Sequence, residues 1–363
     1  MNVLSKHETE ALARHVAEGA GAPGAGMRTQ TALIAAGAAL AATALVVQRR
    51  SQDVERTHPP IGKFIEVDGV RLHYTERGDG QPLVMLHGVG AMMQDLIISG
   101  IVDMAASKYR VILFDRPGYG YSERPRTTIW TPHAQARLLH KALQQMGIAQ
   151  PIVFAHSWAG MVATAMALDF PDDVKSLVLL SGYYYPTARL DIPYMAAPSI
   201  PLVGDLMRYT ISPLLGRAIW PAMKRKLFAP APVPRRFEQE FPTWMTLRPS
   251  QLRASAAEYA LLIPAAYAMQ ARYHELLLPV VIMAGDGDRH VDTRLHSERL
   301  HHELPHSSFL VAHGAGHMVH HCAQDQVMAA IDEAATAVGA VPVEHQRAQA
   351  GQSYVFPSPG QVS

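Results

Sequence analysis

Cysteine is almost absent from this sequence, which has Cys322 as its single cysteine in 363 residues. One cysteine cannot form an intrachain disulfide, and it excludes a metal site built from several thiolates. Charge of one sign is also lacking, because 32 basic and 31 acidic residues leave a net charge of +1. No long basic run interleaved with aromatic residues is present, so the composition argues against nucleic-acid binding. The 48% hydrophobic residues are enough for a large core.

Long apolar runs are scarce as well, with one exception near the N-terminus. Residues 31–47 (TALIAAGAALAATALVV) are 17 residues without a charge, the lower limit for crossing a bilayer. Arg49 and Arg50 follow this run, and we expect a transmembrane anchor at residues 31–48. A buried alanine-rich helix is the alternative. A cleaved signal peptide is disfavoured by the long polar lead and the lack of an A-x-A site.

The charges beside this run predict which side of a membrane the rest of the chain occupies. Two basic residues precede the run within 20 positions and four follow it: Arg14 and Arg28, then Arg49, Arg50, Arg56 and Lys63. This excess favours a cytoplasmic rather than periplasmic body. By composition, residues 1–30 form a flexible segment and residues 339–363 a disordered tail.

Beyond Pro60 the pattern is that of a sheet protein. FIEVDG and RLHYTER alternate like a hairpin, and short apolar runs then recur: PLVMLHG, YRVILFD, PIVFAHS, SLVLLSG and PVVIMAG. Helix-like segments separate them, for example residues 132–146 and 158–169. This alternation predicts a mostly parallel α/β sheet flanked by helices, with its site at the carboxyl ends of the strands. Residues 60–186 and 275–338 are expected to form this core.

The alternation is interrupted between the two parts of the core. Residues 187–274 are rich in proline, methionine, tyrosine and tryptophan, and they show helical periods without a buried strand. We expect this stretch to be a helical cap over the sheet. Its apolar and aromatic content fits either ordinary packing or a pocket for an apolar substrate group.

Ser157 lies where a strand-like run meets a helix-like run, in FAHSWAG. A sharp turn there would lift the hydroxyl above the sheet, and the small neighbours Ala155 and Ala159 would let strand and helix approach closely. A serine in such a place is also a common helix N-cap. A nucleophilic role therefore requires a base and an acid elsewhere in the chain.

The candidates for these partners also follow strand signals. His317 lies in the glycine-rich loop GAGH after SSFLVAH, and Asp288 lies in GDGD after PVVIMAG. Asp286 and Asp292 are competing acids. The order nucleophile, acid and base, each after a strand, matches a hydrolase arrangement and selects Ser157, Asp288 and His317 as catalytic residues. The amides of Val89 and Trp158 are the expected donors to an oxyanion.

Five motifs in order carry a family resemblance that runs from about Ile61 to Val338: LHGVG at 86–90, DRPGYGYS at 115–122, AHSWAG at 155–160, GDGD at 285–288 and GAGH at 314–317. With them the chain resembles the cap-bearing esterase, epoxide-hydrolase and dehalogenase-like branch of the α/β-hydrolase fold. In that family the first loop builds the oxyanion hole, and the second motif implies a structural role for Asp115. The chain departs from the usual GxSxG, because alanine occupies both glycine positions.

The resemblance implies a chemistry. Epoxide hydrolases and dehalogenases place an aspartate where this chain has Ser157, so a serine implies an acyl-enzyme intermediate and cleavage of a carboxylic ester or related acyl compound. The expected partner is a small, apolar acyl substrate, and no cofactor or metal is required. The same triad on this fold also serves carbon–carbon bond hydrolases and cofactor-free haloperoxidases, and a non-catalytic ligand-binding protein is a third hypothesis. A zinc site built from His313, His317, His320 and His321 with Cys322 is disfavoured, because the spacing is not HExxH and the GAGH resemblance already assigns His317.

Overall fold

The computed structural model of the protein describes residues 25–340, in two units. One unit ends at Val46, and the folded body begins at Val47. Most of the expected flexible segment and nearly all of the expected tail lie outside the described residues. Residues 25–30, which the composition assigned to the flexible segment, are helical.

Helix α2, Ala25–Thr57, contains the apolar run found in the sequence. Its stretch Thr29–Thr57 is long and apolar enough to cross a membrane, with a mean hydropathy of 1.9 in its most apolar window. Only 6% of that window is buried, so this part of the helix is not a core helix of the folded body. An anchor and an N-terminal signal share these properties.

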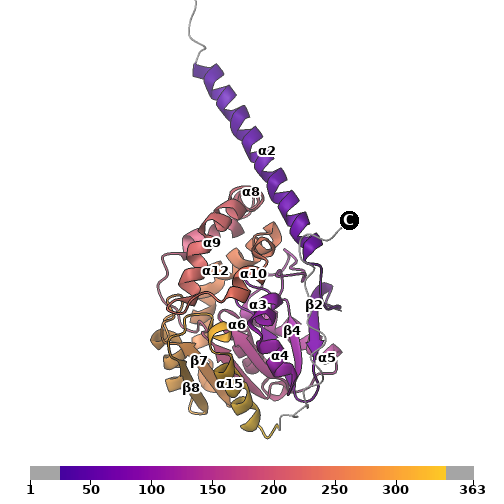
Figure 1. Ribbon diagram of the computed structural model, residues 1–363, viewed down its shortest axis with the longest axis vertical. Helices are drawn as coiled ribbons and strands as arrows, with labels where there is room; N and C mark the ends of the chain where they lie inside the picture. Colours follow the sequence, from indigo (N-terminus) through magenta and orange to yellow (C-terminus); the bar gives the residue numbers. More distant parts are fainter. Residues whose placement is uncertain (1–24, 341–363) are drawn as a thin grey trace, which may run out of the picture. The chain divides into compact units, whose positions relative to one another are not determined.

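The body is built on one eight-stranded sheet with the order β1-β2-β4-β3-β5-β6-β7-β8 (Figure 1). The β1–β2 and β2–β4 pairs are antiparallel and all other pairs are parallel. The strands are β1 Lys63–Val67, β2 Val70–Arg77, β3 Pro82–Leu86, β4 Arg110–Phe114, β5 Ile152–His156, β6 Ser176–Leu180, β7 Val280–Gly285 and β8 Ser307–Ala312. The predicted fold class, a mostly parallel sheet flanked by helices, is confirmed.

Helices cover both faces of the sheet, because successive residues of a strand point to opposite sides. Leu83 and Met85 of β3 pack on one face with α3, α4 and α15, whereas Val84 and Leu86 pack on the other with α5 and α6. The central strands β5, β6 and β7 are buried along their whole length, which explains their unbroken apolar runs. These helices are α3 Met93–Ser99, α4 Ile101–Ala106, α5 Pro132–Gln145, α6 Ala159–Asp169 and α15 Gln324–Thr336.

Among the described residues, the connection from β6 to β7 contains helices and no strand. We call its helical part, residues 187–274, the cap segment. Its longest helix, α12, contacts α7, η2 and α8. The elements are α7 Ile192–Ala196, η2 Ala197–Ser199, α8 Val203–Tyr209, α9 Ile211–Phe228, α10 Arg235–Glu240, α11 Thr243–Thr246, α12 Pro249–Gln270 and η3 Tyr273–Glu275.

Short helices complete the described chain. They are the 3-10 turn η1 Pro171–Asp173, the π-helical turn η4 Arg294–Glu298, α13 Arg299–Glu303 and α14 Val319–Cys322. η4 follows the loop after β7, and α14 follows the loop after β8. These loops lie at the carboxyl ends of parallel strands, where sites of open α/β sheets form.

Candidate active site

Ser157 occupies a sharp turn between β5 and α6. Its φ of +57° lies in the left-handed region, which non-glycine residues rarely adopt. The turn is held because the Ser157 amide donates to the carbonyl oxygen of Leu180 on the neighbouring strand at 2.8 Å. Ala155 and Ala159 are fully buried beside it, so alanine at both positions is compatible with the elbow. The turn directs the serine hydroxyl away from the sheet.

The loop after β3 passes very close to this turn. A side-chain carbon built on Gly88 would lie 3.1 Å from both Ser157 Cβ and His156 Nδ1. Such spacing is tighter than ordinary van der Waals contact, so a larger residue at position 88 would press on Ser157 and His156. The loop is therefore positioned directly over the serine.

The three residues selected from motif order lie within hydrogen-bonding distance of one another. His317 Nε2 is 2.9 Å from Ser157 Oγ, and His317 Nδ1 is 2.7 Å from Asp288 Oδ2. All three side chains are buried. With Nδ1–H donating to the carboxylate, Nε2 is free to accept the serine proton, which is the geometry of a general base beside a nucleophile.

Asp288 is fixed independently of the imidazole. Its Oδ1 accepts from the amides of His290 at 2.7 Å and Val291 at 3.0 Å, which leaves Oδ2 for His317. The competing acids are engaged elsewhere. Asp286 Oδ2 lies 3.0 Å from Nδ1 of His313, and Asp292 accepts from the amide of Leu295 at 2.9 Å.

The two amides expected to hold an oxyanion flank the same space. Val89 and Trp158 line a small pocket together with Ser157. Neither amide has a hydrogen-bond partner among residues 25–340. The rest of the pocket is mostly apolar and aromatic, with one cation, and consists of Tyr183, Arg189, Tyr259, Leu262, His290 and Val291. Tyr259 and Leu262 come from α12 of the cap segment.

A buried arginine supports the loop that carries Val89. Arg116 donates from Nε to the carbonyl of His87 at 2.8 Å and from Nη2 to that of Gly88 at 3.0 Å. Its Nη1 pairs at 2.6 Å with Glu258 of α12, and both side chains are fully buried. Sequence reasoning missed this pair, although Glu258 interrupts an otherwise apolar run, SAAEYALL, and that interruption was the available signal.

Two pKa values in this cluster are lowered, those of Glu258 and His87, for different reasons. Burial alone would raise the pKa of Glu258, but the charge of Arg116 and its hydrogen bonds lower it below the usual range. Burial and then the charge of Arg116 lower the pKa of His87 to about 4. His87 is thus neutral at physiological pH. Its Nδ1–H donates to Gly88 at 2.8 Å and its Nε2 accepts from the Arg116 amide at 3.1 Å.

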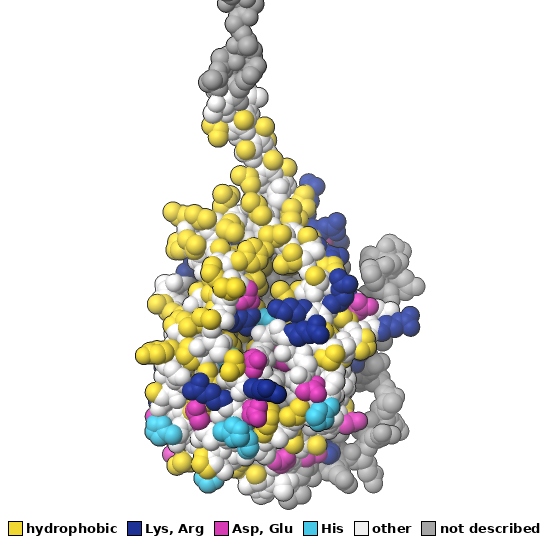
Figure 2. Space-filling model, turned by 90° about the vertical axis from the view of Figure 1, so that its left-hand side faces the viewer, with side chains coloured by type: hydrophobic (Ala, Val, Ile, Leu, Met, Phe, Trp, Pro, Cys, Tyr) yellow, Lys and Arg dark blue, Asp and Glu magenta, His cyan; other side chains and the backbone are white. Residues whose placement is uncertain are grey.

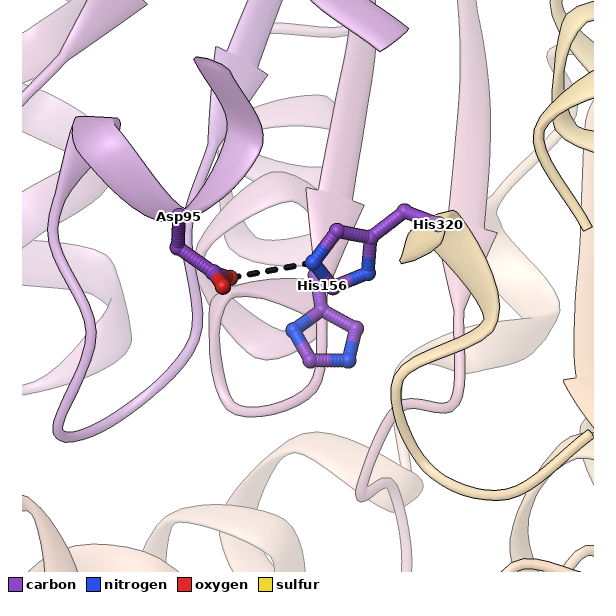
Figure 3. Close-up of side chains that lie close together, drawn as sticks. All are labelled: Asp95, His156 and His320. Carbon is purple, nitrogen blue, oxygen red and sulfur yellow. Dashed lines mark hydrogen bonds and ion pairs between the residues drawn. The ribbon is translucent and has the colours of Figure 1, made fainter. Parts of the chain in front are cut away.

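A group of buried histidines lies behind the site, where Asp95 of α3, His156 of β5 and His320 of α14 converge (Figure 3). His156 Nε2 lies 3.0 Å from the carbonyl oxygen of His317, so the imidazole donates to the backbone of the expected base. Burial, then the neighbouring His320 and His317, hold the pKa of His156 well below its usual value. A neutral His156 is the form that makes this hydrogen bond.

Asp95, His156 and His320 are also a set that could hold a metal ion, with ligand atoms within 4.8 Å of one another. Both carboxylate oxygens of Asp95 are already engaged, by His320 Nε2 at 3.0 Å and by His321 Nε2 at 2.9 Å. Both oxygens of the buried carboxylate therefore have a hydrogen-bonding partner. The arrangement is that of a hydrogen-bonded network that supports α14 and the loop of His317.

Comparison with known proteins identifies the family. A family model for the alpha/beta hydrolase fold matches residues 81–322, more than half of the chain. The chain therefore belongs to the α/β-hydrolase fold family, as the motifs predicted, and it is an α/β-fold hydrolase. A thermophilic esterase from Thermogutta terrifontis shares the fold, with a TM-score of 0.61 and 18% identity over 76% of this chain and 100% of that chain.

Two curated relatives show the range of activities in the family. The 2-hydroxymuconate semialdehyde hydrolase of Pseudomonas putida is 32% identical over 148 residues, which are 39% of this chain and 52% of that protein. Lipase 1 of Psychrobacter immobilis is 31% identical over 138 residues, which are 37% of this chain and 41% of that protein. The matches span about half or less of the length of these relatives.

Proposed function

We propose that this protein is a serine hydrolase that cleaves a carboxylic ester, or a related lactone or thioester, through an acyl-enzyme intermediate. The observation that carries the proposal is the chain of contacts from Asp288 to His317 to Ser157, at 2.7 and 2.9 Å. An isolated serine hydroxyl is a poor nucleophile, and this chain of contacts supplies both a base and an orienting acid.

In the proposed mechanism, His317 Nε2 takes the proton of Ser157 as Oγ bonds to the carbonyl carbon of the substrate. The amides of Val89 and Trp158 donate to the developing oxyanion. The tetrahedral intermediate collapses, the bond to the leaving group breaks, and His317 returns its proton to the departing alcohol or thiol. Water then attacks the acyl-enzyme with His317 as base, the bond between the acyl carbon and Oγ breaks, His317 returns its proton to Ser157 Oγ, and the carboxylic acid leaves.

The pocket supports an apolar substrate group. Tyr183, Tyr259, Leu262 and Val291 offer apolar surface close to Ser157. Contact with such surface favours apolar acyl or alcohol groups, because their transfer out of water is favourable.

The proposal includes a membrane anchor at residues 31–47. The apolar composition of α2 and the absence of burial in its most apolar window support it. The excess of arginine and lysine after the run supports a cytoplasmic body. Full release of the protein from membranes by high salt without detergent would contradict the anchor.

A fluorophosphonate probe tests the nucleophile directly. Wild type should be labelled, and Ser157→Ala should lose labelling together with at least about 10⁴-fold of its esterase activity. Ser181→Ala is the matched control, because Ser181 is also buried, also follows a strand and also has a positive φ of 47°. Labelling that persists in Ser157→Ala would remove the proposal.

Carbon–carbon bond hydrolysis is the second candidate, and the relative from Pseudomonas putida favours it. A panel of p-nitrophenyl esters beside a vinylogous diketone separates the two activities. Turnover of the diketone at a higher kcat/KM than every ester would select the second candidate. Both reactions would still require Ser157.

A further inference from the structure

The cap segment exposes many apolar side chains on its surface between residues 193 and 215. Every exposed residue between positions 193 and 215 is aliphatic, tyrosine or proline. Leu202 is 84% exposed and Leu206 is 55% exposed. We call these exposed residues of 193–215 the cap face. Figure 2 shows hydrophobic side chains gathered over this part of the body, and soluble proteins rarely expose contiguous apolar patches of more than a few hundred Å².

The two charged side chains of residues 193–215, Asp205 and Arg208, are paired with each other, and Arg208 is buried. Arg208 is 3% exposed, and its guanidinium donates to the carbonyl of Pro198 and to the carboxylate of Asp205. Asp205 in turn accepts from Arg126 at 2.6 Å. Helix α8 thus buries Arg208 and exposes Leu206, and Leu202 is exposed just before the helix begins, which is the reverse of the usual amphipathic arrangement in water.

Helix α9 continues the face with helical spacing. Ile211, Leu214, Leu215 and Ala218 are all exposed and occur at i, i+3, i+4 and i+7, so they form one stripe along the helix. Exposed basic residues lie within and beyond this stretch of the helix, at Arg217, Arg225 and Lys226. An apolar stripe bordered by arginine and lysine is typical of a helix that lies in the interface of a membrane with anionic lipids.

Two further features favour a lipid surface over another protein as the occupant. Tyr194 and Tyr209 are each 50% exposed on the cap face, and tyrosine is enriched at membrane interfaces. The body also begins at Val47, directly after the proposed anchor, and α2 continues to Thr57 without a break. Ten helical residues extend only about 15 Å, so an anchored body remains close to the bilayer.

The same stretch of α2 is attached next to the cap segment. Glu55 pairs with Arg248, the residue before α12, at 2.7 Å, and Val54 belongs to one apolar cluster with Met245 of α11. The end of the body nearest the proposed anchor is thus joined to cap helices.

We propose that the cap face inserts into the headgroup and acyl-chain boundary of the bilayer that holds the anchor. Leu202, Leu206 and the stripe of α9 enter the apolar layer, and the arginines and lysine of α9 contact lipid phosphates. The inference rests on the proposed anchor for its proximity to lipid. It is independent of the chemistry proposed at Ser157.

Site-directed fluorescence on the full chain tests this proposal. In a Cys322→Ala background, Leu206→Cys carries an NBD label in vesicles of phosphatidylcholine with phosphatidylglycerol. Leu277→Cys is the matched control, because Leu277 is 77% exposed and lies outside the cap face. Ala39→Cys reports the anchor. The label at 206 should shift to the blue, lose about half its emission to doxyl lipids and resist aqueous iodide, whereas the label at 277 should respond only to iodide.

Each outcome decides a separate point. Equal behaviour of the labels at 206 and 277, with the label at 39 quenched by doxyl lipids, overturns the cap-face proposal and leaves the anchor in place. A blue shift at 206 without doxyl quenching indicates a second copy on this face and also overturns it. Doxyl quenching of the label at 206 but not of the label at 39 supports the cap-face proposal and contradicts the proposed anchor. Leu202→Cys repeats the test if Leu206→Cys does not fold, as judged by circular dichroism.

Discussion

At the scale of single residues, Ser157 shows how a conformation is stabilised for chemistry. A non-glycine residue in the left-handed region costs about 1–3 kcal/mol, and the hydrogen bond to Leu180 and the dense packing around Ala155 and Ala159 oppose its relaxation. The left-handed conformation places the Ser157 hydroxyl 2.9 Å from Nε2 of His317. Both alanines that stand in place of the usual glycines are fully buried, and the turn between them keeps its hydrogen bond to Leu180.

Asp288→Asn should lower kcat of ester hydrolysis by about 10⁴-fold, because an amide at this position favours the wrong tautomer of His317. The amides of His290 and Val291 would still hold the side chain, so stability should change little. Asp286→Asn is the control, since Asp286 is on the same loop and lies beside the exposed His313. Steady-state kinetics of both variants test the assignment of Asp288 as the acid that orients His317. Equal losses of kcat in the two variants would contradict this assignment.

His156 should act as a positioning residue, through its hydrogen bond to the His317 carbonyl. His156→Leu should reduce kcat by about 10- to 100-fold with little change in KM, because a small displacement of the base weakens proton transfer more than substrate binding. His156→Gln retains a donor and should recover most of the rate. A fall of similar size in both variants would indicate a packing role only.

At the scale of elements, Glu258→Gln tests how α12 is held on the core. The substitution leaves the buried charge of Arg116 without its carboxylate, which should lower the free energy of unfolding by about 3–5 kcal/mol. Glu275→Gln is the control, because Glu275 forms a partly exposed pair with Arg272 that should contribute less than about 1 kcal/mol. Denaturant titrations of the two variants measure the difference. Similar losses in the two variants would show that the buried Arg116–Glu258 pair contributes no more to stability than the partly exposed Arg272–Glu275 pair.

The elements themselves were largely predictable from the sequence. Strands buried on both faces give unbroken apolar runs, and the residues expected at 132–146 and 158–169 form α5 and α6. Motif order also selected three side chains that lie within hydrogen-bonding distance. Arg116 and Glu258 escaped prediction because 142 residues separate them and no local pattern encodes their pairing. The inward turn of Arg208 also escaped prediction, because an apolar stripe normally indicates the face that meets the core, whereas here Leu206 is exposed and Arg208 is buried.

At the scale of the whole molecule, neutral buried histidines make stability depend on pH. Burial lowers the pKa of His87 and of His296 to about 4, below the value of about 6.5 for an unfolded chain. Between these values the unfolded chain binds more protons, so the free energy of unfolding falls as pH decreases from 6.5 to 4. Each histidine contributes up to about 3 kcal/mol to this loss.

Chemical denaturation in detergent at pH 7 and at pH 4.5 measures the effect. We expect a drop of several kcal/mol, with most of the change below pH 6.5, because His156, His290 and His320 also have lowered pKa values through burial. His296→Gln should make the dependence shallower. An unfolding free energy that is constant over this range would contradict the prediction.

The position of Arg116 has a consequence for how substrate reaches the serine. One guanidinium bonds the carbonyls of His87 and Gly88 and also the carboxylate of α12. If α12 moved outward, the buried charge of Arg116 would lose its carboxylate partner, and the side chain that holds the loop of His87 and Gly88 would be destabilised at the same time. Helix α8, in contrast, pairs with the core through a partly exposed salt bridge between its Asp205 and Arg126. Because the Arg126–Asp205 pair is partly exposed and the Arg116–Glu258 pair is buried, we expect α8 to move more easily than α12 and substrate to enter on the side of α8.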